Sequence, residues 1–222
     1  MEHHMHDMDD AIGADLDLYH ARMREEGRRP REEAPGGRDG GQDQRMRAIG
    51  PDTGRMLNIM ARSLDRPTIL ELGTSFGYSA IWLAEAARAT GGKLITMERH
   101  GYKSAHARDM AQKAGLAEWI DFRVGDAVAM IGELTQKVDF VFVDLWKDLY
   151  VPCLDAFYPR LNPGAIIVAD NMIRPATHDV KRYGRAIRAL PAISSVLLPV
   201  GTGIEVSRFG PEAATFGGST MI

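Results

Sequence analysis

The stretch that decides the fold is "ILELGTSFGYSAIWLAEA", residues 69–86. An apolar run carrying one acid ends in a glycine. A loop of small residues and a second glycine follow, and the chain then takes on the apolar spacing of a helix. This order is typical of a nucleotide-binding turn at the carboxyl edge of a parallel sheet. Gly73 and Gly77 lack the spacing of the dinucleotide fingerprint, in which a pyrophosphate approaches the helix N-terminus.

Apolar strands alternate with helical segments after this turn. The patterns predict strands at 68–72, 93–98, 120–124, 138–144 and 165–170, and helices at 77–90, 101–114, 126–135, 148–161 and about 176–190. Strands that are apolar throughout indicate a parallel sheet covered on both faces. Two last strands, near 194–200 and 203–209, are separated only by "GTG" and predict an antiparallel hairpin. We therefore expect an α/β, Rossmann-like fold with a seven-stranded, mostly parallel sheet.

Length and composition are those of one globular core with appendages. The chain has 222 residues, of which 45% are hydrophobic and 26% charged. A net charge of −3 gives no electrostatic reason to expect a nucleic acid partner, and no apolar run is long enough to predict a membrane span. The single cysteine, Cys153, excludes an intrachain disulfide framework and is consistent with the cytoplasm, where we expect the protein.

The N-terminal part differs from the rest in composition. A weak helical pattern runs through residues 1–27, and the Gly, Arg and Pro content of 27–45 is typical of a mobile loop. We therefore divide the chain into an N-terminal helix with a flexible, lid-like segment, 1–45, and a domain that carries the chemistry, 46–222. Three histidines near the start, His3, His4 and His6, suit either a metal or a solvated terminus.

Four acidic residues come at or near the ends of successive strands, where ligands of open α/β sheets bind: Glu71, Glu98, Asp126 and Asp144. Any one of them alone is more often a helix cap or turn residue. Glu71 would repel a pyrophosphate but suits the amino group of a cationic ligand without phosphates. Glu98 is placed to accept hydrogen bonds from ribose hydroxyls, and Asp126 suits an adenine amino group. Together they favour S-adenosylmethionine.

A second polar group follows the fourth and fifth strands. Asp144 ends one strand, and Asp170 and Asn171 end the next. Two carboxylates and an amide oxygen are hard ligands suited to Mg²⁺, with Mn²⁺ or Ca²⁺ as competitors. A plain turn after a buried strand is the alternative reading of the Asp-Asn pair. Lys147, three residues after Asp144, is either a general base or a solvated surface lysine.

The segment 49–209 resembles the class I, metal-dependent O-methyltransferases, the group of the catechol and caffeoyl-CoA O-methyltransferases. The motifs "IGPDTGRML", "ILELGTSFGYSA", "ITMERH", "VGDA", "VDLWKDLY" and "VADNMIRP" are similar to those of the family and stand in family order. The last two motifs are most similar to the catechol branch, whereas Asp126 in "VGDA" is similar to the caffeoyl-CoA branch. The resemblance implies the S-adenosylmethionine methyltransferase fold.

The resemblance also implies roles for individual residues. The residues expected to bind the cofactor are Ile49, Glu71, Gly73, Ser75, Gly77, Ser79, Glu98, Arg99, Gly125, Asp126, Ala127, Asp144 and Trp146. The expected metal ligands are Asp144, Asp170 and Asn171. Lys147 is the expected general base, and Glu205 is expected to hold the second, unmethylated hydroxyl of a catechol. Met46 and Arg47 are further candidates for lid or cofactor contacts.

The implied reaction is metal-assisted methyl transfer to a hydroxyl of a small vicinal dihydroxy-aromatic molecule. A caffeoyl-CoA-like or natural-product O-methyltransferase is the nearest alternative. A nicotinamide-dependent oxidoreductase would need a glycine triplet that is absent. A protein that only binds the nucleoside would not need Lys147 and the metal ligands. The sequence leaves a homodimer open.

Overall fold

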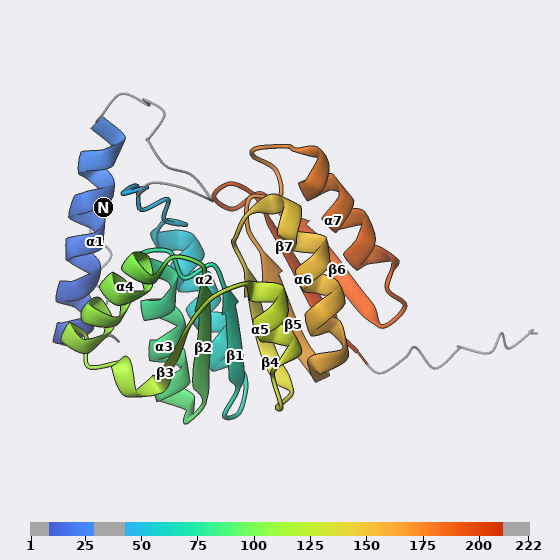
Figure 1. Cartoon of the computed structure of the whole chain (residues 1–222), viewed down its shortest axis with the longest axis horizontal. Coiled ribbons are helices and arrows are strands. Elements are labelled where there is room, and N and C mark those ends of the chain that lie inside the picture. Colours follow the sequence, from blue (N-terminus) through green and yellow to red (C-terminus); the bar gives the residue numbers. More distant parts are fainter. Residues whose placement is uncertain (1–8, 29–42, 211–222) are drawn as a thin grey trace, which may run out of the picture.

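The computed structural model describes residues 9–28 and 43–210. They form one seven-stranded sheet in the order β3-β2-β1-β4-β5-β7-β6 (Figure 1). The strands are β1 Thr68–Leu72, β2 Lys93–Glu98, β3 Ile120–Val124, β4 Val138–Val143, β5 Leu161–Ala169, β6 Ile193–Leu198 and β7 Ile204–Phe209. All neighbours are parallel except β7, which runs antiparallel to both β5 and β6. The predicted fold, including the antiparallel final hairpin, is confirmed.

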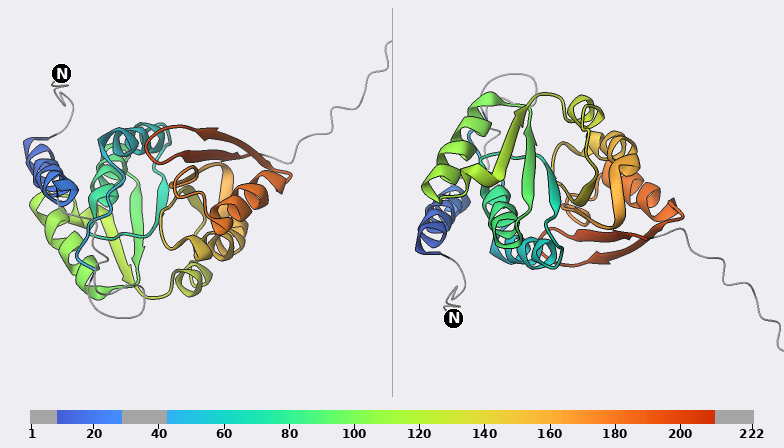
Figure 2. Two further views of the ribbon diagram at one scale, coloured as in Figure 1. Left: turned by 90° about the horizontal axis from the view of Figure 1, so that it is seen from above. Right: turned by 90° about the horizontal axis from the view of Figure 1, so that it is seen from below.

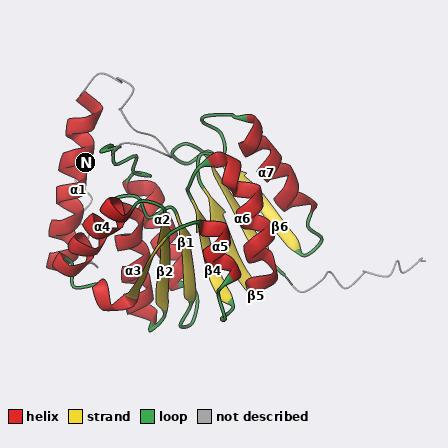
Figure 3. Cartoon of the chain, in the orientation of Figure 1, coloured by secondary structure: helices red, strands yellow, loops and turns green. Residues whose placement is uncertain are grey.

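Helices cover both faces of this sheet. They are α1 Asp10–Arg28, α2 Pro51–Arg62, α3 Tyr78–Thr90, α4 Gly101–Lys113, α5 Ala127–Gly132, α6 Tyr150–Phe157 and α7 His178–Ala189. Buried residues of α1 to α4 share one hydrophobic cluster with one face of the sheet, and those of α5 to α7 share a second cluster with the other face. Figures 2 and 3 show the sheet between these two helical layers. No helix among the described residues is long and apolar enough to cross a membrane.

The strands alternate between the two clusters because successive side chains point to opposite faces of a sheet. In β4, Phe140 and Phe142 belong to the α1–α4 side, and Val141 and Val143 to the α5–α7 side. All four are fully buried, which is why β4 reads as a continuous apolar run. The same alternation decides which face of the sheet each acidic side chain of a strand points to.

Two elements differ from the sequence-based expectation. Helix α2 was not predicted, although Pro51 stands at its first turn, where proline is favoured. Its Gly54 lies against α3 so closely that a Cβ there would come within 2.4 Å of Trp82 Nε1. Helix α6 is shorter than the predicted 148–161, because short 3₁₀ turns flank it on both sides. Strand β5 accordingly begins at Leu161 instead of 165.

The predicted N-terminal helix is present as α1. Ile12, Leu16 and Tyr19 are buried in the same cluster as α3 and α4, and Asp15 is buried beside them at 2% exposure. His3, His4, His6 and most of the predicted mobile loop lie outside the described residues. On the opposite side of the sheet, Cys153 of α6 is fully buried, and burial raises the pKa of its thiol to about 12.

Candidate active site

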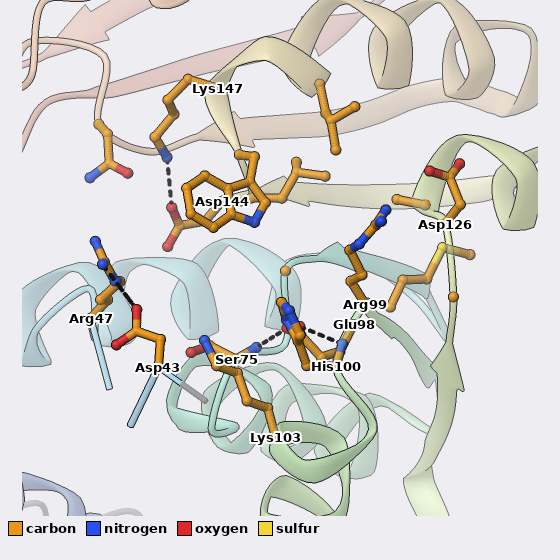
Figure 4. Close-up of a pocket in the computed structure, with 18 of the residues that line it drawn as sticks. Asp43, Arg47, Ser75, Glu98, Arg99, His100, Lys103, Asp126, Asp144 and Lys147 are labelled. Atoms are coloured by element: carbon orange, nitrogen blue, oxygen red, sulfur yellow. Dashed lines mark hydrogen bonds and ion pairs between the residues drawn. The ribbon is translucent and has the colours of Figure 1, made fainter. Parts of the chain in front are cut away.

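A cavity of about 440 Å³ lies beyond the carboxyl ends of β1 to β5. Figure 4 shows Lys147 and Asp144 near one end of it, Asp126 at the other and Glu98 between them. A small adjoining cavity shares Gly73, Ser75, Arg47 and Asp144 with the first one and adds Ile49 and Ser79. Predicted cofactor residues that line one or both cavities are Ile49, Gly73, Ser75, Ser79, Glu98, Arg99, Gly125, Asp126, Ala127, Asp144 and Trp146.

The glycine loop, residues 73–77, passes close to two other segments of the chain. Gly73 has a φ of 102°, and a Cβ on it would stand 2.2 Å from the carbonyl oxygen of Asp144. Gly77 has a φ of 95°, and a Cβ on it would stand 2.7 Å from Cβ of Ala107 in α4. Gly73 therefore lets the loop approach the β4 end. Gly77 does not line either cavity, and it serves the start of α3 instead.

Glu98 is an anionic acceptor held in place by backbone donors. It ends β2, its side chain is largely buried, and it faces the middle of the cavity. One carboxylate oxygen accepts a hydrogen bond from the Ser75 amide at 2.8 Å, and the other accepts one from the His100 amide at 3.0 Å. A carboxylate fixed in this way can accept further hydrogen bonds from the hydroxyls of a bound ligand.

Glu71 lies beneath the cavity and not in its wall. Its neighbours Leu70 and Leu72 face the α5–α7 side, so Glu71 points to the α3 side, where it is fully buried. One oxygen accepts a hydrogen bond from Thr96 Oγ1, and the other has no partner among the described residues. Burial raises the pKa of Glu71 to about 7. Glu71 does not line either cavity, and its predicted contact with the cofactor stays a prediction.

Lys147 stands at the other end of the cavity in a short 3₁₀ turn after β4. Its Nζ lies 3.2 Å from Asp144 Oδ1 and donates a hydrogen bond to the Tyr150 hydroxyl at 2.7 Å. Only 21% of the Lys147 side chain and 17% of the Asp144 side chain are exposed, so water screens this pair less than an ordinary surface pair. The lysine is held inside the site and is not a solvated surface residue.

Asp170 and Asn171 follow β5 beside Asp144. Asp170 is nearly fully buried, and burial together with the Asp144 charge raises its pKa to about 6. Asn171 lines the cavity and has a φ of 60°. Its side-chain nitrogen Nδ2 donates a hydrogen bond to Thr202 Oγ1 at 2.8 Å, which leaves the side-chain oxygen Oδ1 for a ligand. Two mutually repelling carboxylates beside a polar oxygen fit a hard divalent cation.

Side chains of His, Cys, Asp and Glu alone do not form a metal site in the described part of the chain, since no three of them gather at one point. The fit for a cation therefore depends on the Asn171 oxygen in addition to Asp144 and Asp170.

Glu205 is not in the cavity. It stands on β7 between Ile204 and Val206, which pack on the α1–α4 side, so its own side chain faces α7. Arg188 of α7 donates to both carboxylate oxygens, with Nε 2.7 Å from Oε1, and Ser195 donates to Oε1. Glu205 is 1% exposed. The structure thus separates Glu205 from Lys147, although the sequence prediction placed both at the substrate.

Several cavity residues were not predicted from the sequence. Asp43 is almost fully buried, and its Oδ2 lies 2.9 Å from Nη2 of Arg47. The backbone oxygen of Asp43 accepts a hydrogen bond from the Tyr102 hydroxyl. Burial alone would raise the pKa of Asp43, but hydrogen bonds from Arg45 and Arg47 hold it below the usual value. No motif marks Asp43, which lies within the segment predicted as a loop. His100, Lys103 and Pro175 also line the cavity without having been predicted.

Comparisons with known proteins identify the family of this chain. Residues 41–209 match the family model described as O-methyltransferase. The chain is 31% identical over 166 residues to catechol O-methyltransferase of Niastella koreensis, covering 68% of this chain and 75% of that protein. It is 29% identical over 180 residues to caffeoyl-CoA O-methyltransferase 2 of Eucalyptus globulus, covering 71% and 72%.

A solved structure has the same fold. It is the O-methyltransferase TomG from Streptomyces achromogenes, involved in tomaymycin synthesis and solved in complex with SAM. It superposes with a TM-score of 0.72 at 24% identity, covering 94% of this chain and 93% of that one.

Proposed function

This chain belongs to the O-methyltransferase family that includes the catechol and caffeoyl-CoA enzymes, and from that membership we propose its reaction. The methyl group of S-adenosylmethionine is transferred to one hydroxyl of a small vicinal dihydroxy-aromatic acceptor. Lys147 is the general base, and a divalent cation assists. The observation that carries the proposal is that one cavity is lined by Glu98 near its middle and by Asp144 and Lys147 near one end.

The cofactor fits the middle and the Asp126 end of this cavity. Glu98 accepts hydrogen bonds from the ribose hydroxyls, and Asp126 lies where the adenine would end. Asp126 caps α5 by accepting a hydrogen bond from the Ala129 amide at 3.0 Å through Oδ1, which leaves Oδ2 for the adenine amino group. Arg99 and Trp146 form further parts of the wall. A cofactor held in this way would direct its methyl group towards the Lys147 end of the cavity.

The acceptor end supplies the chemistry. The acceptor oxygen forms a bond to the methyl carbon while the carbon–sulfur bond breaks and its electron pair stays on sulfur. The hydroxyl proton passes to Nζ of Lys147. Asp144, Asp170 and Asn171 would hold the cation, which supplies Lewis-acid stabilisation of the acceptor oxygen. Alignment of acceptor and methyl group within one cavity accounts for the rest of the rate enhancement.

Glu205 has no part in this proposal, because Arg188 and Ser195 bind its carboxylate beneath α7. The acceptor is therefore oriented by the Asp144 end of the cavity alone. Catechols and caffeoyl-CoA-like thioesters are both compatible with such an arrangement. A panel of free catechols, flavonoids and thioester conjugates, with methylated products identified by mass spectrometry, separates these acceptor classes.

Replacing Lys147 tests the proposal directly. Lys147→Met keeps the length of the side chain but cannot take a proton, so kcat should fall by about 10²- to 10⁴-fold. The Kd for S-adenosylmethionine, measured by titration calorimetry, should stay within about twofold, since Lys147 lies at the opposite end of the cavity from Asp126, where we expect the adenine.

Lys137→Met is the matched control, because Lys137 precedes β4 at the end opposite to Lys147, does not line the cavity and donates to the Pro159 carbonyl. Wild-type turnover in Lys147→Met would remove Lys147 as the base. Tight binding of NAD with no binding of S-adenosylmethionine would overturn the whole proposal.

A further inference from the structure

Tyr150 joins the two strand ends that carry the proposed chemistry. It is the first residue of α6, three positions after Lys147, and its side chain is fully buried. Its hydroxyl donates to the backbone oxygen of Asp170 at 3.0 Å and accepts from Lys147 Nζ at 2.7 Å. Tyr150 therefore links the end of β5 to the lysine that follows β4.

The direction of these hydrogen bonds is fixed by the number of protons. A phenol has one hydrogen, and here that hydrogen points to the Asp170 carbonyl, which can only accept. The Tyr150 oxygen therefore offers a lone pair to Lys147, and Lys147 must be the donor. The Lys147 nitrogen also lies 4.7 Å from the centre of the Tyr150 ring, so the ring supports the side chain from one side.

These contacts occupy two positions at the Lys147 nitrogen and thereby define the direction of the one that remains. Of the four tetrahedral positions, one is the bond to Cε, one carries the hydrogen directed to Asp144 and one carries the hydrogen directed to Tyr150. An amine takes a proton through the remaining position, where its lone pair lies. With three positions set by the protein, the fourth is set as well.

We propose that Tyr150 is a positioning residue that aims the lone pair of Lys147 at the acceptor hydroxyl. The inference rests on the proposed role of Lys147 as the base. Tyr150 touches neither the acceptor nor the cofactor in this arrangement and acts only through Lys147. Without the Tyr150 hydroxyl, the Lys147 amine keeps only Asp144 as a partner and can rotate about the Cδ–Cε bond.

The chain offers a matched control for the loss of this hydroxyl. Tyr183 of α7 packs edge-on against Tyr150, with ring centroids 5.3 Å apart, and is equally buried. Its hydroxyl has no hydrogen-bond partner among the described residues. Tyr183→Phe therefore removes the same atom from the same pair of rings without touching Lys147.

The experiment compares Tyr150→Phe, Tyr183→Phe and Lys147→Met on catechols whose ring substituents make the reacting hydroxyl more or less acidic. Tyr150→Phe should lower kcat by about two- to tenfold on weakly acidic catechols, the range expected when one hydrogen bond between neutral groups is lost. The loss should shrink on strongly acidic catechols, which need less help from a base. The Kd for S-adenosylmethionine should not change, and Tyr183→Phe should match the wild type.

Each other outcome contradicts the inference in a distinct way. A loss in Tyr150→Phe that is the same for every acceptor, or no loss at all, rejects the positioning role while Lys147 stays the base. Full turnover in Lys147→Met rejects the proposed role of Lys147 as the base, on which this inference rests. All constants are measured at a temperature at which circular dichroism shows that the variants are as folded as the wild type. A lower kcat then reflects the position of Lys147 and not unfolding.

Discussion

Glu98 and Glu71 show how the place of a carboxylate on its strand decides what it can do. Glu98 is the last residue of β2, where its side chain turns into the cavity and accepts hydrogen bonds from two backbone amides. Glu71 lies one residue inside the end of β1 and faces α3. Both were predicted to contact the cofactor, but only Glu98 lines the cavity.

Glu98→Gln should weaken cofactor binding without unfolding the protein. The amide keeps the shape of the carboxylate but loses its charge, and its nitrogen cannot accept a hydrogen bond from Ser75 or His100. We expect the Kd for S-adenosylmethionine to rise by about ten- to a hundredfold, measured by titration calorimetry. Glu118→Gln, at an exposed position, is the control. An unchanged Kd in Glu98→Gln would show that the ribose is held elsewhere.

Residues at or directly after the ends of strands could be placed from the sequence, and residues further inside strands could not. Asp144 and Asn171 follow the apolar runs of β4 and β5, so the rule that ligands bind beyond the carboxyl ends locates them. Glu205 was assigned through its motif alone. The alternation of Ile204 and Val206 with Glu205 turns its side chain to the opposite face, where Arg188 binds it.

At the level of elements, α1 supports the wall of the cavity. Tyr19 donates to the backbone oxygen of Phe76 in the glycine loop at 2.6 Å. Glu26 accepts a hydrogen bond from the Met46 amide at 3.0 Å, and Ser75 donates to the Met46 carbonyl at 3.2 Å. The residues around Met46 are therefore held between α1 and the glycine loop. Sequence reading predicted α1 but not this support, because the contacts join segments far apart in the chain.

Asp15 makes the docking of α1 dependent on pH. Burial raises its pKa from 3.8 to about 6, an effect that Lys113 offsets in part. Below the unfolded pKa the carboxyl is neutral in both states, so ionisation costs nothing. As pH rises through 6 the folded state must hold a buried charge, and stability falls. Asp15→Asn should therefore be more stable than the wild type at pH 7.5, by up to about 3 kcal/mol.

Urea unfolding at pH 5 and pH 7.5 checks this expectation. The advantage of Asp15→Asn should shrink at pH 5, while Asp17→Asn, which changes an exposed residue of the same helix, should show little difference at either pH. An advantage of equal size at both values would mean that the Asp15 charge does not oppose docking.

Across the whole molecule, the cavity draws its walls from segments spread along the chain between Asp43 and Pro175. Asp43 and Arg47 precede the sheet, Glu98 and Asp126 come from its first half, and Pro175 leads into α7. A ligand that fills the cavity therefore binds only the folded chain, and it stabilises the protein by mass action. The two ends of the cavity are nonetheless chemically distinct, since Lys147 and Asp144 stand apart from Asp126 (Figure 4).

Removing the proposed cation with a chelator should stop methyl transfer at the acceptor end and leave cofactor binding intact at the other end. EDTA should stop methyl transfer, because the proposed cation site lies at the acceptor end, and added Mg²⁺ should restore it. Saturating S-adenosylmethionine, at about 100 times its Kd, should still stabilise the chelated protein by about 2.7 kcal/mol against unfolding. Turnover with EDTA and with added Mg²⁺ measures the first effect, and thermal unfolding with and without S-adenosylmethionine measures the second. Full turnover in the chelator would contradict the metal-assisted mechanism.

The burial of Cys153 has a practical consequence for spectroscopy. It is the only cysteine in the chain, it is fully enclosed, and burial raises the pKa of its thiol to about 12, so almost no thiolate exists near neutral pH. Maleimide dyes and spin labels should leave the native protein unmodified. A single cysteine introduced on the exposed face of α1 would then be the only labelled position. Distances from it to a second introduced cysteine could follow how α1 moves when the cavity fills.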